Sequence, residues 1–385
     1  MLLGEETQDN RDTKKLFFFS HRSHNDRFNG TSVYDNELLQ TLEREFYVDF
    51  VEPDYGSRDI TRRSDLNFKS FVSLLYRVYI KQLKWVFTTF KYKNCRKKEK
   101  IMMLVEDIYS SLLPLLISNA FGIKMIYRSA DFGKTYYNTL SINNRVFKFI
   151  YPPARRVLEH FVIKKAAVVV CPSRKMKEEI VQKYPNAESK VVVLPYIKKN
   201  LKLVTDLTSV SVRVPISKVN IVLLGDFRYP PNLLAGRFVL NEVVQKLRSD
   251  RDSFNVQIVG PASNLLFMSS HKSVKILGPV KDLDDLLLNS HIGLAATTTV
   301  GGLSMKIVDY LVNGLRVVST KEAAAGIVPN SQMKVVPLSD FSKTIDEEIS
   351  DLRSNGFNRY ISQEVIEEYM SDEWVNTLMV KMKEL

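Results

Sequence analysis

The fold is decided by residues 292–319, IGLAATTTVGGLSMKIVDYLVNGLRVVS. A continuous apolar run, Ile292–Ala295, leads into a loop with two glycines, and helical spacing follows from about Leu303. Gly314 can end that helix, and Arg316–Ser319 forms a second short apolar run. Runs that are apolar throughout, without alternation, are typical of parallel strands buried on both faces. The stretch therefore predicts a strand–helix–strand unit of a doubly wound α/β sheet.

The same alternation continues outward over most of the chain. Twelve apolar runs are predicted as strands: Leu16–Ser20, Tyr47–Val51, Ile101–Val105, Lys124–Tyr127, Ala167–Val170, Val191–Leu194, Val219–Leu224, Asn255–Val259, Val274–Leu277, Ile292–Ala295, Arg316–Ser319 and Lys334–Val336. Segments with helical spacing lie between them, for example residues 31–44 and 232–248.

The number of residues indicates more than one core. One hydrophobic core rarely serves more than about 250–300 residues, and the chain has 385. Two series of strands predict two Rossmann-like domains, residues 1–200 and 201–365, joined through the polar segment 198–217. Residues 366–385 are predicted to form one or two helices that can pack back on the first domain.

Positive charge is concentrated in one segment. The chain has 55 Lys and Arg against 43 Asp and Glu, a formal net charge of +12. Residues 1–199 contribute +13 (35 basic, 22 acidic), and residues 200–385 contribute −1 (20 basic, 21 acidic). Residues 58–100 alone hold 13 basic and three acidic side chains. A partner attracted by charge therefore concerns one part of the first half rather than the whole molecule.

Cysteine content and hydropathy bear on the compartment. The two cysteines, Cys95 and Cys171, exclude a disulfide scaffold and a multi-cysteine metal site, and they fit a reducing compartment. The first 15 residues lack the apolar core of a signal peptide. The most apolar long run, residues 101–127, is interrupted by charged residues, so no transmembrane helix is expected. We expect a cytoplasmic protein that can attach to the inner face of a membrane.

The glycine pair at Gly301 and Gly302 predicts a phosphate site. Glycines between a parallel strand and a helix let a phosphate approach the backbone, where the N–H groups of residues 301–304 and the helix dipole can hold it. Ser304 adds a hydroxyl and Lys306 a charge, while Asp309 lies one turn further and can accept from ribose hydroxyls. A purely structural turn fits the same residues and stays open.

A second glycine-containing turn begins the second half. The run Val219–Leu224 is followed by GDFRYPPN (225–232) and then by helical spacing. Arg228 in this turn can reach a diphosphate. The alternative is that the two prolines only start the helix and that Arg228 is solvent-exposed.

Several motifs together resemble a known family. GDFRYPPNLLAGRFVLNEVV (225–244), VQIVG (256–260), VKILGPVKDL (274–283) and the Gly301–Ser319 block occur in this order. They resemble the donor domain of the retaining, nucleotide-sugar-dependent glycosyltransferases of family four, which have the two-domain GT-B fold. The first half agrees more loosely, through the Gly30 loop, IYRSADFGKTYY (126–137) and the segment 168–197.

The resemblance implies roles for individual residues. The family has two glutamates with seven residues between them; the ribose-binding one corresponds to Asp309, and the sugar-contacting one falls on Gly301, which has no side chain. The family's Arg and Lys at the donor diphosphate have stand-ins in Arg228 and Lys306. The histidine of the first-domain R-S-H-N motif falls on Ala130, next to Asp131. Gly30, Arg228, Gly301, Gly302, Leu303, Ser304, Lys306 and Asp309 are thus the predicted donor-binding residues.

The resemblance also implies a mechanism. The donor lies in a cleft between the two domains, and a same-face displacement transfers the sugar with retention. Amides and cations stabilise the leaving diphosphate, so no catalytic metal and no organic cofactor are expected. Glu106, at the end of a first-sheet strand, and Asp131 are the candidates for acceptor contact or proton transfer. Gly301 and Ala130 leave two alternatives open: a non-catalytic subunit that binds a nucleotide sugar, and a nucleotide-sugar epimerase of the same fold.

The basic segment 66–100, LNFKSFVSLLYRVYIKQLKWVFTTFKYKNCRKKEK, interleaves aromatic and cationic residues. A basic amphipathic helix with Trp and Tyr suits an anionic membrane surface, where each cation contributes about 1 kcal/mol. We predict a membrane contact through Lys81, Lys84, Trp85, Lys91 and Lys93, which would bring a lipid-linked glycan acceptor to the cleft. A helix that packs on the core with a solvated basic face is the alternative. Nucleic acid is not expected as a partner, because no nucleic-acid-binding motif accompanies the charge.

Overall fold

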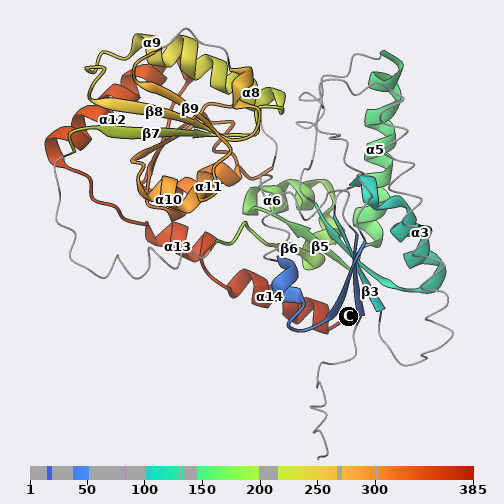
Figure 1. Cartoon of the computed structure of the whole chain (residues 1–385). Coiled ribbons are helices and arrows are strands. Elements are labelled where there is room, and N and C mark those ends of the chain that lie inside the picture. Colours follow the sequence, from blue (N-terminus) through green and yellow to red (C-terminus); the bar gives the residue numbers. More distant parts are fainter. Residues whose placement is uncertain are drawn as a thin grey trace, which may run out of the picture.

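The computed structural model describes most of the chain. The described residues are 15–19, 38–51, 83, 101–106, 108–129, 132, 145–198, 216–266, 271–299 and 302–385. They form two six-stranded parallel sheets with helices between the strands (Figure 1). All twelve predicted strands are present, with ends that differ from the predicted ones by at most one residue.

The first sheet contains the strands before residue 199. They are β1 (Lys15–Phe19), β2 (Tyr47–Val51), β3 (Ile101–Glu106), β4 (Lys124–Arg128), β5 (Val168–Cys171) and β6 (Val191–Val193). Helices α3 (Leu112–Phe121), α5 (Arg145–Lys165) and α6 (Arg174–Lys183) connect them. The spatial order is β2-β1-β3-β4-β5-β6, so the strand order reverses between β1 and β3.

The second sheet repeats this arrangement. Its strands are β7 (Val219–Leu224), β8 (Phe254–Val259), β9 (Val274–Gly278), β10 (Ile292–Ala295), β11 (Arg316–Ser319) and β12 (Met333–Val335). The helices are α8 (Pro230–Phe238), a π-helical turn (Val239–Val243), α9 (Val244–Lys246), α10 (Leu283–Leu288), α11 (Met305–Val312) and α12 (Phe341–Asn355). The spatial order is β12-β11-β10-β7-β8-β9, and the reversal lies between β7 and β10.

Two helices end the chain. Helix α13 (Gln363–Tyr369) packs against α11 of the second domain, and α14 (Glu373–Lys383), coloured red, lies beneath the first sheet in Figure 1. Lys383 Nζ lies 2.7 Å from Glu45 Oε2, and Lys381 Nζ donates to the Ser189 carbonyl at 2.8 Å. These contacts attach the end of the chain to residues of the first half.

The carboxyl ends of the two sheets face each other. Ser173 follows the end of β5, and Gly326 lies seven residues after the end of β11. A Cβ placed on Gly326 would lie 3.0 Å from Ser173 Oγ. Segments that follow strands of different sheets therefore touch.

A tyrosine fixes α11 against the second sheet. Tyr310 is fully buried, accepts from the Leu224 N–H at 2.8 Å and donates to the Leu294 carbonyl at 3.3 Å. Its ring covers Gly293, where a Cβ would lie only 2.4 Å from the ring. The start of α11 is thereby held over the ends of β7 and β10. In the described part of the chain, no helix is long and apolar enough to cross a membrane.

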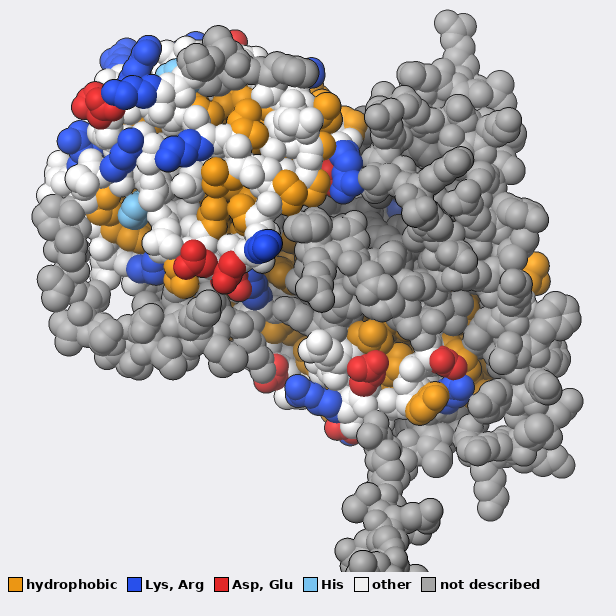
Figure 2. Space-filling view, viewed as in Figure 1, with side chains coloured by type: hydrophobic (Ala, Val, Ile, Leu, Met, Phe, Trp, Pro, Cys, Tyr) orange, Lys and Arg blue, Asp and Glu red, His pale blue; other side chains and the backbone are white. Residues whose placement is uncertain are grey.

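Charge on the second sheet's domain is dispersed. On the face shown in Figure 2, its acidic and basic side chains are interspersed and separated by uncharged surface. This agrees with the net charge of −1 over residues 200–385. The surface in view therefore has no extended field of one sign on this domain.

Candidate functional site: a cationic site where the second sheet reverses

The second sheet brings two predicted donor-site segments together. In open α/β sheets, ligands bind outside the carboxyl ends of the strands where the strand order reverses. Here that point lies between β7 and β10, whose following loops lead into α8 and α11. Lys306 on α11 donates to Asn232 Oδ1 on α8 at 2.8 Å and so bridges this point.

Lys306 is a desolvated cation. Burial lowers the pKa of its ammonium to about 8, and among the described residues no carboxylate forms an ion pair with it. A lysine held away from water next to a neutral amide is poorly stabilised as a cation. An anion brought to this point would restore the missing charge partner.

The start of α11 adds hydrogen-bond donors. Gly302 has φ of 61°, a conformation that favours glycine, and turns the chain into the helix. Ser304 is the N-cap residue, yet its hydroxyl makes no capping hydrogen bond. The first N–H groups and the dipole of α11 consequently add to the attraction for an anion.

The β7–α8 loop arranges a further cation. Arg228 Nε and one Nη donate to the two oxygens of Asp226, each at 2.9 Å. Asn232 Nδ2 donates to the Asp226 carbonyl at 3.0 Å, which orients the amide that receives Lys306. Arg228 is therefore neither fully exposed nor aimed freely at a ligand; its guanidinium is held by a carboxylate two residues earlier.

Asp309 has a partner that the sequence did not indicate. Lys198 Nζ lies 3.0 Å from Asp309 Oδ1 and 2.7 Å from Asp284 Oδ1. Burial raises the pKa of Asp309, and Lys198 opposes that rise. For Lys198, burial lowers the pKa, but Asp309 and Asp284 outweigh burial and raise it above the ordinary lysine value.

In the first sheet, Glu106 lies at the carboxyl end of β3, beside the reversal of that sheet. It is fully buried, and Arg128, its register partner on β4, lies 3.8 Å from Glu106 Oε1. Glu106 is therefore part of a buried pair at the carboxyl edge of the first sheet. Its predicted contact with an acceptor stays a prediction.

Eight predicted residues or loop positions lie outside the described residues. They are Gly30, Gly301 and Asp131, together with the basic segment's Lys81, Lys84, Trp85, Lys91 and Lys93. Their roles remain predictions. Leu303 lies in the described loop before α11 and is half-buried.

No catalytic metal is expected from the sequence, and the acidic groups of the second domain bear on that expectation. Two Asp-x-Asp sequences occur there, Asp250–Asp252 and Asp282–Asp284, a pattern that can present two carboxylates to a divalent cation. Asp282 accepts from Asp285 N at the start of α10, Asp284 pairs with Lys198, and Asp252 pairs with Lys272 at 2.9 Å. Within the described residues, no group of three His, Cys, Asp or Glu could hold a metal ion.

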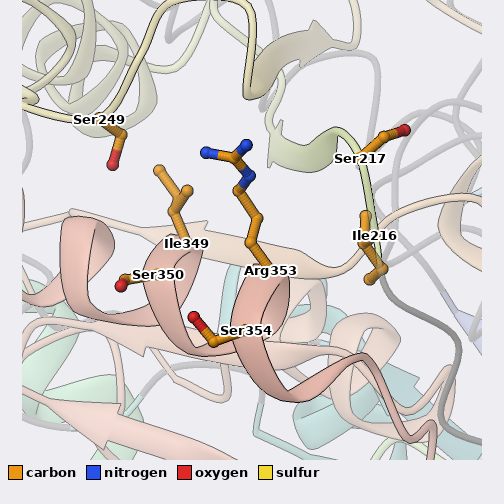
Figure 3. A pocket seen from close by; sticks show the side chains of 7 residues that line it. All are labelled: Ile216, Ser217, Ser249, Ile349, Ser350, Arg353 and Ser354. Carbon is orange, nitrogen blue, oxygen red and sulfur yellow. The ribbon is translucent and has the colours of Figure 1, made fainter.

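A cavity of about 520 Å³ lies elsewhere on the second domain (Figure 3). Arg353 points into it from α12, opposite Ser217 just before β7. Because Ser217 precedes the first residue of β7, this cavity lies at the amino end of the sheet. It is remote from the carboxyl edge at which Lys306 and Asn232 meet.

Two residues of the site were missed from the sequence. Asn232 belongs to the PPN turn, so its motif was recognised without its contact to Lys306. Lys198 lies in the polar segment between the domains and carried no local signal. A lysine 111 positions from its carboxylate partner cannot be identified from spacing.

Comparisons with known proteins agree with this geometry. Residues 218–355 match the family model described as glycosyl transferases group 1. No curated protein sequence matches the chain.

Solved structures show the same fold. A structure of Anabaena Alr3699/HepE in complex with UDP and glucose matches with a TM-score of 0.59 and 13% identity, over 97% of this chain and 100% of that one. A glycosyltransferase from Rickettsia africae matches with a TM-score of 0.58 and 15% identity, over 97% and 98%. An α,α-trehalose-phosphate synthase (UDP-forming) from Burkholderia xenovorans, in complex with glucose-6-phosphate, matches with a TM-score of 0.60 and 10% identity, over 96% and 100%.

At these identities the structural matches establish fold alone. Together with the two reversed parallel sheets, they show that the chain has the GT-B architecture of two Rossmann-like domains, and that residues 218–355 form a domain of the group 1 glycosyltransferase type.

Proposed function

We propose that the protein transfers a sugar from a nucleoside diphosphate sugar to a hydroxyl group of a glycan or lipid-linked glycan, with retention at the sugar carbon. The observation that carries the proposal is Lys306, a desolvated ammonium at the first turn of α11, placed where the second sheet reverses. The group 1 match over residues 218–355 supports it. UDP and glucose bound in the Anabaena protein support a donor of the same class here.

The site suits a leaving diphosphate. As the bond from the sugar carbon to the diphosphate oxygen breaks, negative charge grows on that oxygen. Lys306 and the dipole at the start of α11 are in place before the reaction, so little reorganisation is needed to stabilise this charge. Arg228, held by Asp226, supplies a second cation on the neighbouring loop.

Other parts of the chain complete the proposal. Asp309 accepts from the ribose hydroxyls, and Glu106 and Asp131 remain the candidates for contact with the acceptor and for receiving its proton. The acceptor hydroxyl attacks from the face that the diphosphate leaves, which gives retention. We further propose that the basic segment 66–100 contacts an anionic membrane and that transfer needs no metal ion, so that EDTA leaves turnover unchanged.

Purified protein incubated with a panel of UDP-, GDP-, ADP- and CDP-sugars and membrane lipid extract tests the proposal. We expect one donor to release free nucleoside diphosphate and to label a glycan or lipid. Lys306→Met should lower turnover about 100-fold or more, since one preorganised donor to the developing charge is commonly worth that much. Lys275→Met, an exposed lysine on the edge strand β9, is the matched control and should retain full activity.

Thermal unfolding of Lys306→Met tests whether a loss of activity comes from a loss of folding. Lys306→Met removes a desolvated cation, so its thermal unfolding temperature should not fall. Binding of a donor without any turnover would instead favour the non-catalytic subunit. Conversion of the donor without acceptor and without free nucleotide would favour the epimerase.

A further inference from the structure

Lys198 lies where the chain leaves the first sheet, at the start of the polar segment 198–217 that leads to the second domain. It follows β6, the last strand of the first sheet, and reaches two helices of the second domain. Its Nζ lies 2.7 Å from Asp284 Oδ1 on α10 and 3.0 Å from Asp309 Oδ1 on α11. The side chains of Lys198 and Asp309 are each 13% exposed, whereas that of Asp284 is 38% exposed.

The two carboxylates depend differently on this lysine. Asp284 is open to water, which can solvate its charge. Asp309 is nearly enclosed, and burial together with the neighbouring charge of Asp284 raises its pKa, while Lys198 lowers it. Without a cation at this place, Asp309 would lose most of what keeps it ionised.

Ionisation decides what Asp309 can do for a ribose. A carboxylate accepts hydrogen bonds at both oxygens, whereas a protonated carboxyl must itself donate at one. Lys198 engages Oδ1, and among the described residues no group donates to Oδ2. Lys198 therefore leaves one charged oxygen of Asp309 for a ligand hydroxyl.

The backbone of Lys198 is held at two points of the crossover. Its N–H donates to the Tyr369 carbonyl at the end of α13 at 2.8 Å, and the preceding Ile197 is buried in the core. The Tyr369 hydroxyl in turn accepts from the Val328 N–H at 3.0 Å. The ammonium is consequently placed by the first sheet and the returning helix, not by α11 itself.

We propose that Lys198 is a positioning residue of the nucleotide site: it holds the Asp309 carboxylate charged and oriented to accept from the ribose of the donor. The inference rests on the proposed function, because it concerns the nucleotide of the same donor. It assigns a role in nucleotide recognition to the segment between the domains, outside the residues 218–355 that match the glycosyltransferase model.

Calorimetric binding separates this role from a structural one. The probes are UDP, GDP, ADP and CDP, of which the tightest binder is used, and inorganic pyrophosphate, which has no ribose. Lys198→Met should weaken binding of the nucleotide about tenfold or more and leave binding of pyrophosphate within twofold. Lys198→Arg, which keeps the charge, should recover most of the loss.

A double-mutant cycle tests the route through Asp309. Asp309→Asn should weaken nucleotide binding, and Lys198→Met added to Asp309→Asn should weaken it little further, because both act on one carboxylate. Arg174→Met is the matched control: Arg174 also joins the halves, 3.2 Å from Glu368 and over the Trp374 ring, without reaching Asp309. It should leave nucleotide binding unchanged.

The outcomes are distinguishable. The inference is overturned if Lys198→Met binds the nucleotide normally while Asp309→Asn does not, or if Lys198→Met weakens pyrophosphate equally, or if Arg174→Met reproduces the loss. If the unaltered protein binds none of the four nucleotides, the proposed function fails and the inference fails with it.

Discussion

At the scale of single residues, the position of Lys306 depends on the local sequence, and its charge state depends on the tertiary structure. Its place in the first turn of α11 follows from the sequence, but its desolvation comes from packing against α8. Burial lowers its pKa to about 8, into the range where small changes of pH alter its charge. The charge of this site is therefore sensitive to mildly alkaline conditions in a way that an exposed lysine is not.

The pH dependence of nucleotide binding follows from this pKa. The charged form of Lys306 binds the diphosphate, and it is the main form below pH 8. The affinity for the nucleotide should therefore be nearly independent of pH below pH 8, where Lys306 stays charged. Above pH 8 it should fall by up to tenfold per pH unit. Titration calorimetry between pH 7 and pH 10 measures the slope, and Lys306→Met should lack it. An equal slope in this variant would assign the titration to another group.

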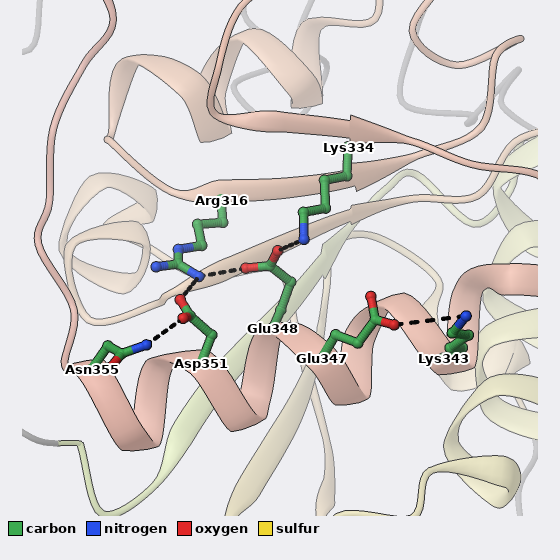
Figure 4. A network of polar contacts seen from close by, with 7 residues as sticks. All are labelled: Arg316, Lys334, Lys343, Glu347, Glu348, Asp351 and Asn355. Carbon is green, nitrogen blue, oxygen red and sulfur yellow. Dashed lines mark hydrogen bonds and ion pairs between the residues drawn. The ribbon is translucent and has the colours of Figure 1, made fainter.

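At the scale of elements, a charge network fastens α12 to the edge of the second sheet (Figure 4). Glu348 on α12 is 5% exposed and lies 2.6 Å from both Arg316 on β11 and Lys334 on β12. Arg316 also reaches Asp351, one turn along the helix, at 2.6 Å. The network lies beside the short edge strand β12, which it helps to hold in the sheet.

Replacing Glu348 should show how much this attachment contributes. Glu348→Gln leaves Lys334 without its partner and Arg316 with only Asp351, so we expect a loss of about 2 kcal/mol in the free energy of unfolding. Glu347→Gln is the matched control, since among the described residues Glu347 pairs only with exposed Lys343, at 3.9 Å, and its loss should change stability by less than about 0.5 kcal/mol. Urea unfolding measures both. Equal losses of unfolding free energy in the two variants would contradict the expectation that the buried Glu348 contributes more than the exposed Glu347.

At the scale of the whole molecule, the two halves are joined by the crossing chain segments. The outgoing segment carries Lys198, and the returning segment carries Tyr369, whose carbonyl and hydroxyl contact Lys198 and Val328. Arg174 adds a contact from α6 to α13 through Glu368. The orientation of the two sheets thus depends on residues that belong to neither sheet.

Tyr369→Phe tests this joint with a minimal change. It removes the acceptor of the Val328 N–H, so hydrogen exchange at residues 326–330 should become faster, and the free energy of unfolding should fall by about 1 kcal/mol. Tyr360→Phe is the control, because the hydroxyl of the exposed Tyr360 donates to Ser331 Oγ at 3.2 Å and to no other group of the described part of the chain. Unchanged exchange at 326–330 in Tyr369→Phe would show that the hydroxyl does not secure this segment.

Particular elements show why prediction succeeded for the strands. β10 and β11 are apolar throughout because helices cover both faces of a parallel sheet, so their local composition identifies them. The start of α11 was predicted at about Leu303 and lies at Met305, since the glycine turn and Ser304 precede the first helical residue. The reversal between β7 and β10, which locates the site, depends on strand order and has no local pattern.

The local sequence is enough to predict the two sets of strands, the glycine turn before α11, and the spacing of Lys306 and Asp309 by one helical turn. The contacts of Lys306 with Asn232, of Arg228 with Asp226 and of Asp309 with Lys198 become visible only in the folded chain. The reason is physical. Strands and helices follow from the hydrophobic pattern of neighbouring residues, whereas the charge state of a site depends on burial and on ions that distant segments bring to it.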